Sequence, residues 1–208
     1  MKPVRARRAP ARPRGRTASV ARRTKETDVR LDLGLDGRGE STIETGLPFF
    51  DHMLDAFARH GFFDLVVRAK GDLAVDAHHT VEDVGLVLGQ ALREALGDKA
   101  GIRRFGESTV PLDEALTTSV VDLSGRPFLA YEVALTPVKI GTFDTELVHD
   151  FLLAFVNRAG MNLHVRTASG RNPHHVVETI FKSLGRALDQ ATQREPRLTG
   201  VLSTKGSL

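Results

Sequence analysis

The chain has 208 residues, of which 41% are hydrophobic and 26% charged, a composition typical of a soluble globular domain that excludes disorder over the whole length. No run of about eighteen uncharged apolar residues occurs, which excludes a membrane-spanning helix. The absence of cysteine excludes disulfides, thiolate nucleophiles and thiolate metal sites, so any metal has to be held by nitrogen and oxygen ligands. We expect a cytoplasmic protein.

The start of the chain is strongly basic. Residues 1–23 hold nine Lys or Arg and no acidic residue, so the rest of the chain has a net charge of −6 although the whole chain has +3. Because this segment has no apolar periodicity, we expect residues 1–22 to form a disordered basic tail. An organelle transit peptide, a weak nucleic-acid contact or a solvated extension would each fit this composition.

Strand and helix signals alternate after the tail. Alternating apolar residues predict strands over 28–37 and 39–46. A helix is predicted over 51–60 and is expected to end at Gly61 as its C-cap. Its apolar stripe consists of Met53, Leu54, Phe57 and Ala58.

A strand and a second helix complete the first half. Residues 62–69 are rich in β-branched and aromatic side chains, which favours a strand. Residues 79–96 predict a helix that Gly97 ends. The apolar face of this helix consists of Val84, Leu88, Ala91, Leu92 and Ala95.

The chain then repeats itself. Residues 76–96 match residues 172–192 at a constant offset of 96, and residues 51–69 match residues 150–168 at an offset of 99. Strands are again predicted before the repeated helices, within 117–137. Such self-similarity indicates a duplicated unit. We therefore predict an α+β fold of two tandem halves, residues 23–104 and 105–208, each a small mixed sheet with two helices on one face, and the halves paired by pseudo-symmetry.

Four of the eight histidines lie in two copies of His-His-x-x-Glu, one opening each repeated helix. On a helix the glutamate can stand beside either histidine, and adjacent histidines point about 100° apart, so one motif can offer ligands in two directions. A single copy would be unremarkable, but two equivalent copies favour metal binding. The motifs are His78, His79 and Glu82 in the first half and His174, His175 and Glu178 in the second.

Two further histidines, His52 and His149, fall near the start of the other repeated helix in each half. Counting them gives six imidazoles and two carboxylates, enough for two sites of three histidines and one glutamate. This donor set suits Mn²⁺, Fe²⁺, Co²⁺ or Zn²⁺ and would leave octahedral positions open. His60 and His164 lack such company and are not expected to be ligands.

The two motifs lie within longer sequence strings that resemble one protein family. The strings LPFFDHMLDAFARHGFFDL, DAHHTVEDVGLVLGQAL, GIRRFG, PLDEAL, DLSGRPFL, NPHHVVETIFKSLGRAL and STKG resemble the imidazoleglycerol-phosphate dehydratase family of histidine biosynthesis, in its stand-alone form. The resemblance runs from about Arg23 to Gly206. It implies a hydro-lyase with the ribosomal protein S5 domain 2-like architecture, and two Mn²⁺ ions per active site, with other divalent transition metals as alternatives.

The resemblance also assigns roles to individual residues. It implies eight metal ligands: His52, His78, His79, Glu82, His149, His174, His175 and Glu178. It implies substrate and phosphate contacts at Glu26, Arg104, Arg126, Lys182, Ser203 and Lys205, and cationic side chains are what a phosphate dianion requires. Glu26 is the expected proton-transfer residue, and Glu82 or Glu178 could contribute to catalysis.

The implied reaction explains the need for metals. The hydrogen removed from the glycerol chain is not acidified by a carbonyl, so the imidazole ring has to serve as the electron sink, and two metals on its nitrogens would stabilise an imidazolate. Loss of the hydroxyl would give a diazafulvene-like intermediate, and loss of the adjacent proton would give an enol that tautomerises to imidazole acetol phosphate.

The family resemblance further implies a homo-oligomer of 24 subunits built from trimers, with active sites between subunits, and no nucleic-acid or membrane partner. Three other classes stay open on the sequence alone. A metal-assembled cage would use the same ligands without catalysis. A dinuclear metallohydrolase would release phosphate from the substrate. A nucleic-acid-binding module would depend on the basic tail and on low salt.

Overall fold

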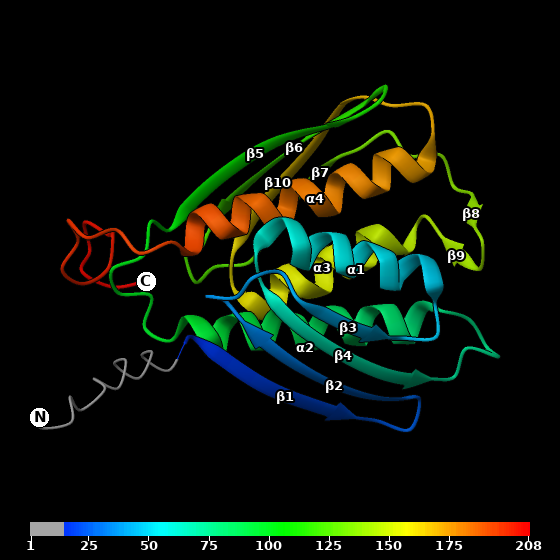
Figure 1. The fold of residues 1–208 in the computed structure, drawn as a ribbon, viewed down its shortest axis with the longest axis horizontal. Coiled ribbons are helices and arrows are strands. Elements are labelled where there is room, and N and C mark those ends of the chain that lie inside the picture. Colours follow the sequence, from blue (N-terminus) through cyan, green and yellow to red (C-terminus); the bar gives the residue numbers. More distant parts are fainter. Residues whose placement is uncertain (1–14) are drawn as a thin grey trace, which may run out of the picture.

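Two four-stranded sheets lie on either side of a layer of helices (Figure 1) in the computed structural model, which describes residues 15–208. The elements of the first half are β1 Thr17–Arg23, β2 Thr27–Gly34, β3 Ser41–Glu44, α1 Pro48–Gly61, β4 Asp64–Gly71 and α2 His78–Leu96. Those of the second half are β5 Phe105–Leu112, β6 Ala115–Asp122, β7 Phe128–Glu132, β8 Lys139–Ile140, β9 Phe143–Asp144, α3 Leu147–Ala159, β10 Asn162–Ser169 and α4 Pro173–Thr192.

The two sheets have the same topology. The strand orders are β1-β2-β4-β3 and β5-β6-β10-β7. In each sheet the last pair, β3 with β4 and β7 with β10, is parallel, and the other pairs are antiparallel. The short hairpin of β8 and β9 is inserted before α3. The prediction of a duplicated α+β fold with mixed sheets is therefore confirmed.

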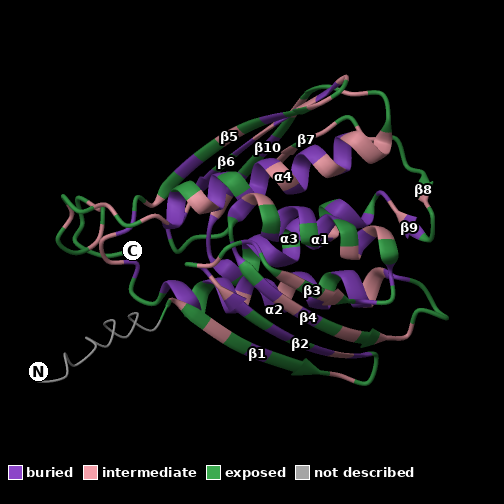
Figure 2. Cartoon of the chain, in the orientation of Figure 1, coloured by how far each residue is buried: buried purple, intermediate pink, exposed green. Residues whose placement is uncertain are grey.

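Each sheet buries one face against the helices. Along β2 the side chains alternate, with Val29, Leu31 and Leu33 buried and the intervening residues more exposed, because successive side chains of a strand point to opposite faces. Helix α2 covers β1 and β2, and α4 covers β5 and β6. Figure 2 shows buried residues concentrated on the helices and exposed residues along the outer strands.

The helices pack in two pairs, α1 with α4 and α2 with α3, so each pair joins a helix from each half. Glycines allow the close approach. A Cβ atom on Gly185 of α4 would lie 2.5 Å from the carbonyl oxygen of Phe57 in α1, and one on Gly61 would lie 2.9 Å from the carbonyl oxygen of Gly185. A side chain larger than hydrogen would therefore push the two backbones apart.

The predicted helix faces are confirmed, since every residue of both predicted apolar stripes is buried. One detail was wrong. Helix α1 does not end with Gly61 as a left-handed C-cap; Gly61 is its last residue, and Phe62 adopts the left-handed conformation at φ 55°. Gly61 serves the contact with α4 instead, whereas Gly160, its match in the second half, is left-handed at φ 65°.

The expectation of a disordered tail over residues 1–22 is wrong for its second part. Residues 17–23 form β1, which pairs with β2 over its whole length. Arg22 of β1 and Arg16, which directly precedes the strand, have acidic partners that composition could not reveal: Arg22 Nε lies 2.7 Å from Oδ1 of the buried Asp83, and Arg16 Nη2 lies 2.6 Å from Asp36 Oδ1. The first fourteen residues of the expected tail lie outside the described residues. Strand β5 was likewise not predicted, so each four-stranded sheet holds one more strand than expected, and the short hairpin of β8 and β9 adds two further strands to the second half.

Within residues 15–208, none of the helices combines the length and the apolar character that crossing a bilayer would require.

Candidate metal centre

The start of α4 and the first turn and a half of α1 bring together three ligands from different halves of the chain. His174 and Glu178 are four residues apart on α4 and share one face of the helix, and the α1–α4 pairing places His52 opposite them. His174 Nε2 lies 3.1 Å and His52 Nε2 lies 3.5 Å from Glu178 Oε2. The three ligand atoms lie within 4.8 Å of one another, so this donor set fits a divalent transition metal.

Lys182, one turn further along α4, completes this cluster. Its Nζ lies 2.6 Å from Glu178 Oε1, and both side chains are largely buried. Burial alone would raise the pKa of Glu178, but the hydrogen bond and charge of Lys182, together with His52 and His174, outweigh it and lower that pKa. Glu178 is thus an anion near neutral pH, as a metal ligand has to be.

The pseudo-equivalent helix pair gathers a second group. His78 of α2 and His149 of α3 approach the same carboxylate, with His78 Nδ1 at 3.3 Å and His149 Nδ1 at 3.6 Å from the oxygens of Asp150. Glu82 follows His78 by one helical turn and is exposed. The pairing of His149 with the first-half motif mirrors the pairing of His52 with the second-half motif.

The second histidine of each motif turns away from its neighbour. The rings of His174 and His175 make an angle of 81°, and those of His78 and His79 an angle of 76°. His175 Nδ1 lies 2.8 Å from Glu114 Oε2, and His79 Nδ1 lies 3.1 Å from Asp72 Oδ2. These hydrogen bonds raise the pKa of both histidines. Hydrogen bonds lower the pKa of Glu114 to about 2, above all the one from the backbone N–H of Asn172, followed by the one from His175.

Glu26 lies in the turn between β1 and β2. Thr24 Oγ1 accepts the backbone N–H of Glu26 at 3.1 Å and that of Thr27 at 3.0 Å, which holds the turn. The carboxylate is more than half exposed and lies 4.0 Å from His79 Nε2. The predicted proton-transfer residue is therefore beside a predicted ligand.

The predicted phosphate contacts, apart from Lys182, lie at the other end of the molecule. The backbone N–H of Arg104 donates to the carbonyl of Ala191 in the last turn of α4, roughly 25 Å along that helix from His174. The Arg104 guanidinium is paired with Asp122 at 2.7 and 3.0 Å and donates to the carbonyl of Leu202 at 2.7 Å.

The remaining phosphate contacts are near Arg104. Ser203 and Lys205 follow Leu202 in the C-terminal segment, where Ser203 Oγ accepts the backbone N–H of Lys205. Arg126 is exposed in the loop after β6, the strand that ends at Asp122. Figure 1 shows the C-terminus at the end of the molecule opposite to the start of α4. Within one chain, the metal ligands and these four predicted phosphate contacts therefore lie at opposite ends of α4.

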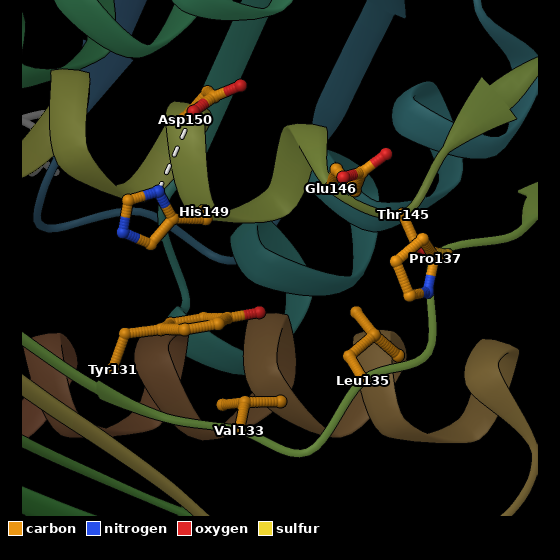
Figure 3. A pocket seen from close by; sticks show the side chains of 8 residues that line it. All are labelled: Tyr131, Val133, Leu135, Pro137, Thr145, Glu146, His149 and Asp150. Carbon is orange, nitrogen blue, oxygen red and sulfur yellow. Dashed lines mark ion pairs between the residues drawn. The ribbon is translucent and has the colours of Figure 1, made fainter.

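A cavity of about 410 Å³ opens beside the second histidine group (Figure 3). Tyr131, Val133, Leu135, Pro137, Thr145, Glu146, His149 and Asp150 line it. The ring of Tyr131 lies 5.2 Å from that of His149, edge to face, and burial raises the pKa of Tyr131 to about 12. It is a neutral hydroxyl at any ordinary pH.

Four residues of this region were not predicted: Asp72, Glu114, Tyr131 and Asp150. Asp150 follows His149 directly, so adjacency was an available signal. Glu114 is separated from His175 by 61 positions, and no local pattern connects them.

Comparison with known proteins gives one consistent result. A sequence model for the family described as imidazoleglycerol-phosphate dehydratase matches residues 45–188. Curated proteins of that name from Geobacter metallireducens and Geobacter sulfurreducens are 60% and 59% identical over 193 residues, which is 93% of this chain and 99% of each relative.

Solved structures agree with these relatives. The crystal structure of imidazoleglycerol-phosphate dehydratase from Staphylococcus aureus has a TM-score of 0.78 at 38% identity and covers 86% of this chain and 99% of its own. The enzyme from Pyrococcus furiosus, crystallised in complex with (S)-C348, has a TM-score of 0.79 at 36% identity and covers 91% of this chain and 100% of its own.

Proposed function

The chain belongs to the imidazoleglycerol-phosphate dehydratase family of hydro-lyases, and from this premise we propose that it dehydrates imidazoleglycerol phosphate to imidazole acetol phosphate in histidine biosynthesis. The observation that carries the proposal is the convergence of His52, His174 and Glu178 from two halves of the chain, the donor set that such an enzyme needs for its metal. We also propose that the enzyme acts in the cytoplasm, which fits this biosynthetic role.

We propose that eight side chains hold two Mn²⁺ ions per active site: His52, His78, His79, Glu82, His149, His174, His175 and Glu178. The nitrogen and oxygen donors, the low pKa of Glu178 and the ligand spacing in the first cluster support this assignment. When bound, the metals supply Lewis acidity to the imidazole nitrogens of the substrate.

The chain's own residues would carry the protons. Glu26 is the proposed proton-transfer residue because its exposed carboxylate stands 4.0 Å from His79 Nε2, within reach of a substrate bound at that histidine. Once the ring has lost its N–H proton, its electron pair would expel the hydroxyl, which takes a proton from an acid and leaves as water, and a diazafulvene-like species would result. Removal of a proton from the next carbon by a base would return an electron pair to the ring and give the enol of the product. Glu82 and Glu178 are further candidates for proton transfer.

Phosphate binding would require a second copy of the chain. The proposed phosphate contacts are Lys182, which stands beside the metal ligand Glu178, together with Arg104, Arg126, Ser203 and Lys205. Arg104, however, is roughly 25 Å along α4 from His174. We therefore propose a homo-oligomer with active sites between subunits, with 24 subunits built from trimers as the expected assembly. No nucleic-acid or membrane partner is proposed.

The products of a single assay separate the alternatives. The purified protein is incubated with imidazoleglycerol phosphate and Mn²⁺, and the ketone and inorganic phosphate are followed together. The proposal predicts ketone with phosphate retained. Free phosphate without ketone would indicate a metallohydrolase, and neither product would indicate a metal-built assembly without catalysis.

A further inference from the structure

Two carboxylates outside the proposed ligand set hold equivalent histidines. Asp72, which follows β4, faces His79 Nδ1 with both oxygens, at 3.1 and 3.3 Å. Glu114, in the turn between β5 and β6, accepts from His175 Nδ1 at 2.8 Å. His79 and His175 occupy the same position in the two motifs, so the duplicated fold has built the same contact twice from different sequence.

The contact determines which nitrogen of the ring is free. A carboxylate can only accept a hydrogen bond, so the proton of a neutral imidazole has to sit on Nδ1 and the lone pair on Nε2. An imidazole binds a metal through its unprotonated nitrogen, and ligating histidines usually donate their other N–H to a carboxylate or carbonyl.

We propose that Asp72 and Glu114 are positioning residues that fix the Nδ1–H tautomer and the ring orientation of His79 and His175, so that each presents Nε2 to a metal. The inference rests on the proposed function, in which these two histidines are ligands. It adds two residues, one per half, whose work is done through the ligands and not through contact with metal or substrate.

The two carboxylates differ in what else they do. The two carboxylate oxygens of Glu114 have different partners. Oε1 accepts hydrogen bonds from the backbone N–H groups of Arg171 and Asn172 at 3.1 and 2.8 Å, and Oε2 accepts one from His175 Nδ1. The side chain of Asp72 has His79 as its hydrogen-bond partner among the described residues. Amide substitutions therefore have opposite consequences at the two positions.

In Glu114→Gln, the two backbone donors hold the amide oxygen, since an amide NH₂ group cannot accept from them. The NH₂ group is then directed at His175 Nδ1, which has to become the acceptor and move its proton to Nε2. The turn before α4 keeps its hydrogen bonds, but the ligand nitrogen is blocked. In Asp72→Asn the amide can rotate its oxygen toward His79, so the tautomer is retained.

The test measures Mn²⁺ affinity by chelator competition on the full-length, metal-stripped protein, together with the thermal unfolding temperature. Loss of such a partner typically weakens metal binding about 10- to 100-fold. We expect that loss in Glu114→Gln and Asp72→Ala, and a change of less than about threefold in Asp72→Asn. Asp113→Asn is the matched control, because Asp113 is exposed and adds negative charge near His175 without a hydrogen bond to it.

Solid-state ¹⁵N NMR of histidine-labelled, metal-free protein adds a signature that a structural role would not change. Glu114→Gln should convert one Nδ1–H histidine to Nε2–H, and Asp113→Asn should convert none. Wild-type Mn²⁺ affinity or unchanged tautomers in Glu114→Gln would overturn the inference at that site, and equal losses in Asp72→Asn and Asp72→Ala would overturn it at the other.

A failure of the proposed positioning role can be distinguished from a failure of the proposed dehydratase activity. If wild-type protein binds Mn²⁺ but does not dehydrate the substrate, the proposed function fails while the affinity series still decides the inference. If dehydration proceeds normally and Glu114→Gln binds Mn²⁺ like the wild type, the inference alone fails.

Discussion

Substitution of Gly185 by alanine tests whether the close crossing of α1 and α4 shapes the metal centre. The new Cβ would lie 2.5 Å from the carbonyl oxygen of Phe57 and 3.1 Å from the backbone nitrogen of Gly61. Both atoms belong to the backbone of α1, so a side-chain rotation cannot relieve the clash. Helix α1, which carries His52, has to move away from His174 and Glu178 on α4.

The magnitude follows from two opposing effects. Overpacking a well-filled interior costs about 1–3 kcal/mol, and a backbone clash of this size falls at the upper end. Alanine in place of glycine in a helix returns about 0.5–1 kcal/mol. The net loss of about 2 kcal/mol corresponds to a decrease in Tm of roughly 4–8 °C for a chain of this length.

Differential scanning calorimetry of the metal-free protein measures the decrease, and Mn²⁺ competition shows whether affinity falls with it. Gly34→Ala is the control, because a Cβ there would meet its neighbours at ordinary distances of 3.6 Å or more. If Gly185→Ala unfolds at the wild-type temperature and binds Mn²⁺ equally well, the close crossing of α1 and α4 does not constrain the metal centre.

Three further predictions address catalysis, pH and metal. Glu26→Gln should bind Mn²⁺ normally but lose turnover by about 10²- to 10⁴-fold; a variant with full kcat would remove Glu26 from the mechanism. Arg16 lowers the pKa of Asp36 below 3.8, mainly through the hydrogen bond between the two side chains. The ion pair therefore stabilises the folded state above the unfolded-state pKa of Asp36, and this stabilisation is lost as the pH falls through the lower folded-state pKa. Asp36→Asn should therefore be less stable than wild type by a constant amount from pH 8 to 5 in urea unfolding, and a gap that closes already between pH 7 and 6 would contradict the pairing. Removal of metal by a chelator should abolish turnover and lower Tm, and added Mn²⁺ should restore both; Tm values that ignore Mn²⁺ would argue against a metal held by the folded chain.

The sequence predicted the helices because their signals are local, and it predicted the duplication because the two halves repeat one another. The stripe from Met53 to Ala58 repeats with the helical period, and all of it is buried. The repeat at offsets of 96 and 99 required two equivalent halves, which the matching sheet orders confirm. Strand β1 was missed for a physical reason: the arginines in and before it are typical of a solvated tail, whereas Arg22 is paired with Asp83 and Arg16 with Asp36.

The candidate site was predicted only as far as its residues are close in sequence. The helical spacing of His174 and Glu178 was visible, and the structure adds which helix supplies the third ligand, His52. The carboxylates that hold the histidines come from distant segments, so composition and spacing carried no signal for Glu114. The separation of Arg104 from the metal ligands likewise depends on the length and direction of α4.

The most direct test of metal-dependent dehydration is the turnover of metal-stripped protein on imidazoleglycerol phosphate as Mn²⁺ is added in known amounts. We predict no ketone without metal. Ketone formation should rise with bound Mn²⁺ and level off at two ions per active site, with phosphate retained in the product. Undiminished ketone formation by the metal-free protein, or none at saturating Mn²⁺, would contradict this prediction.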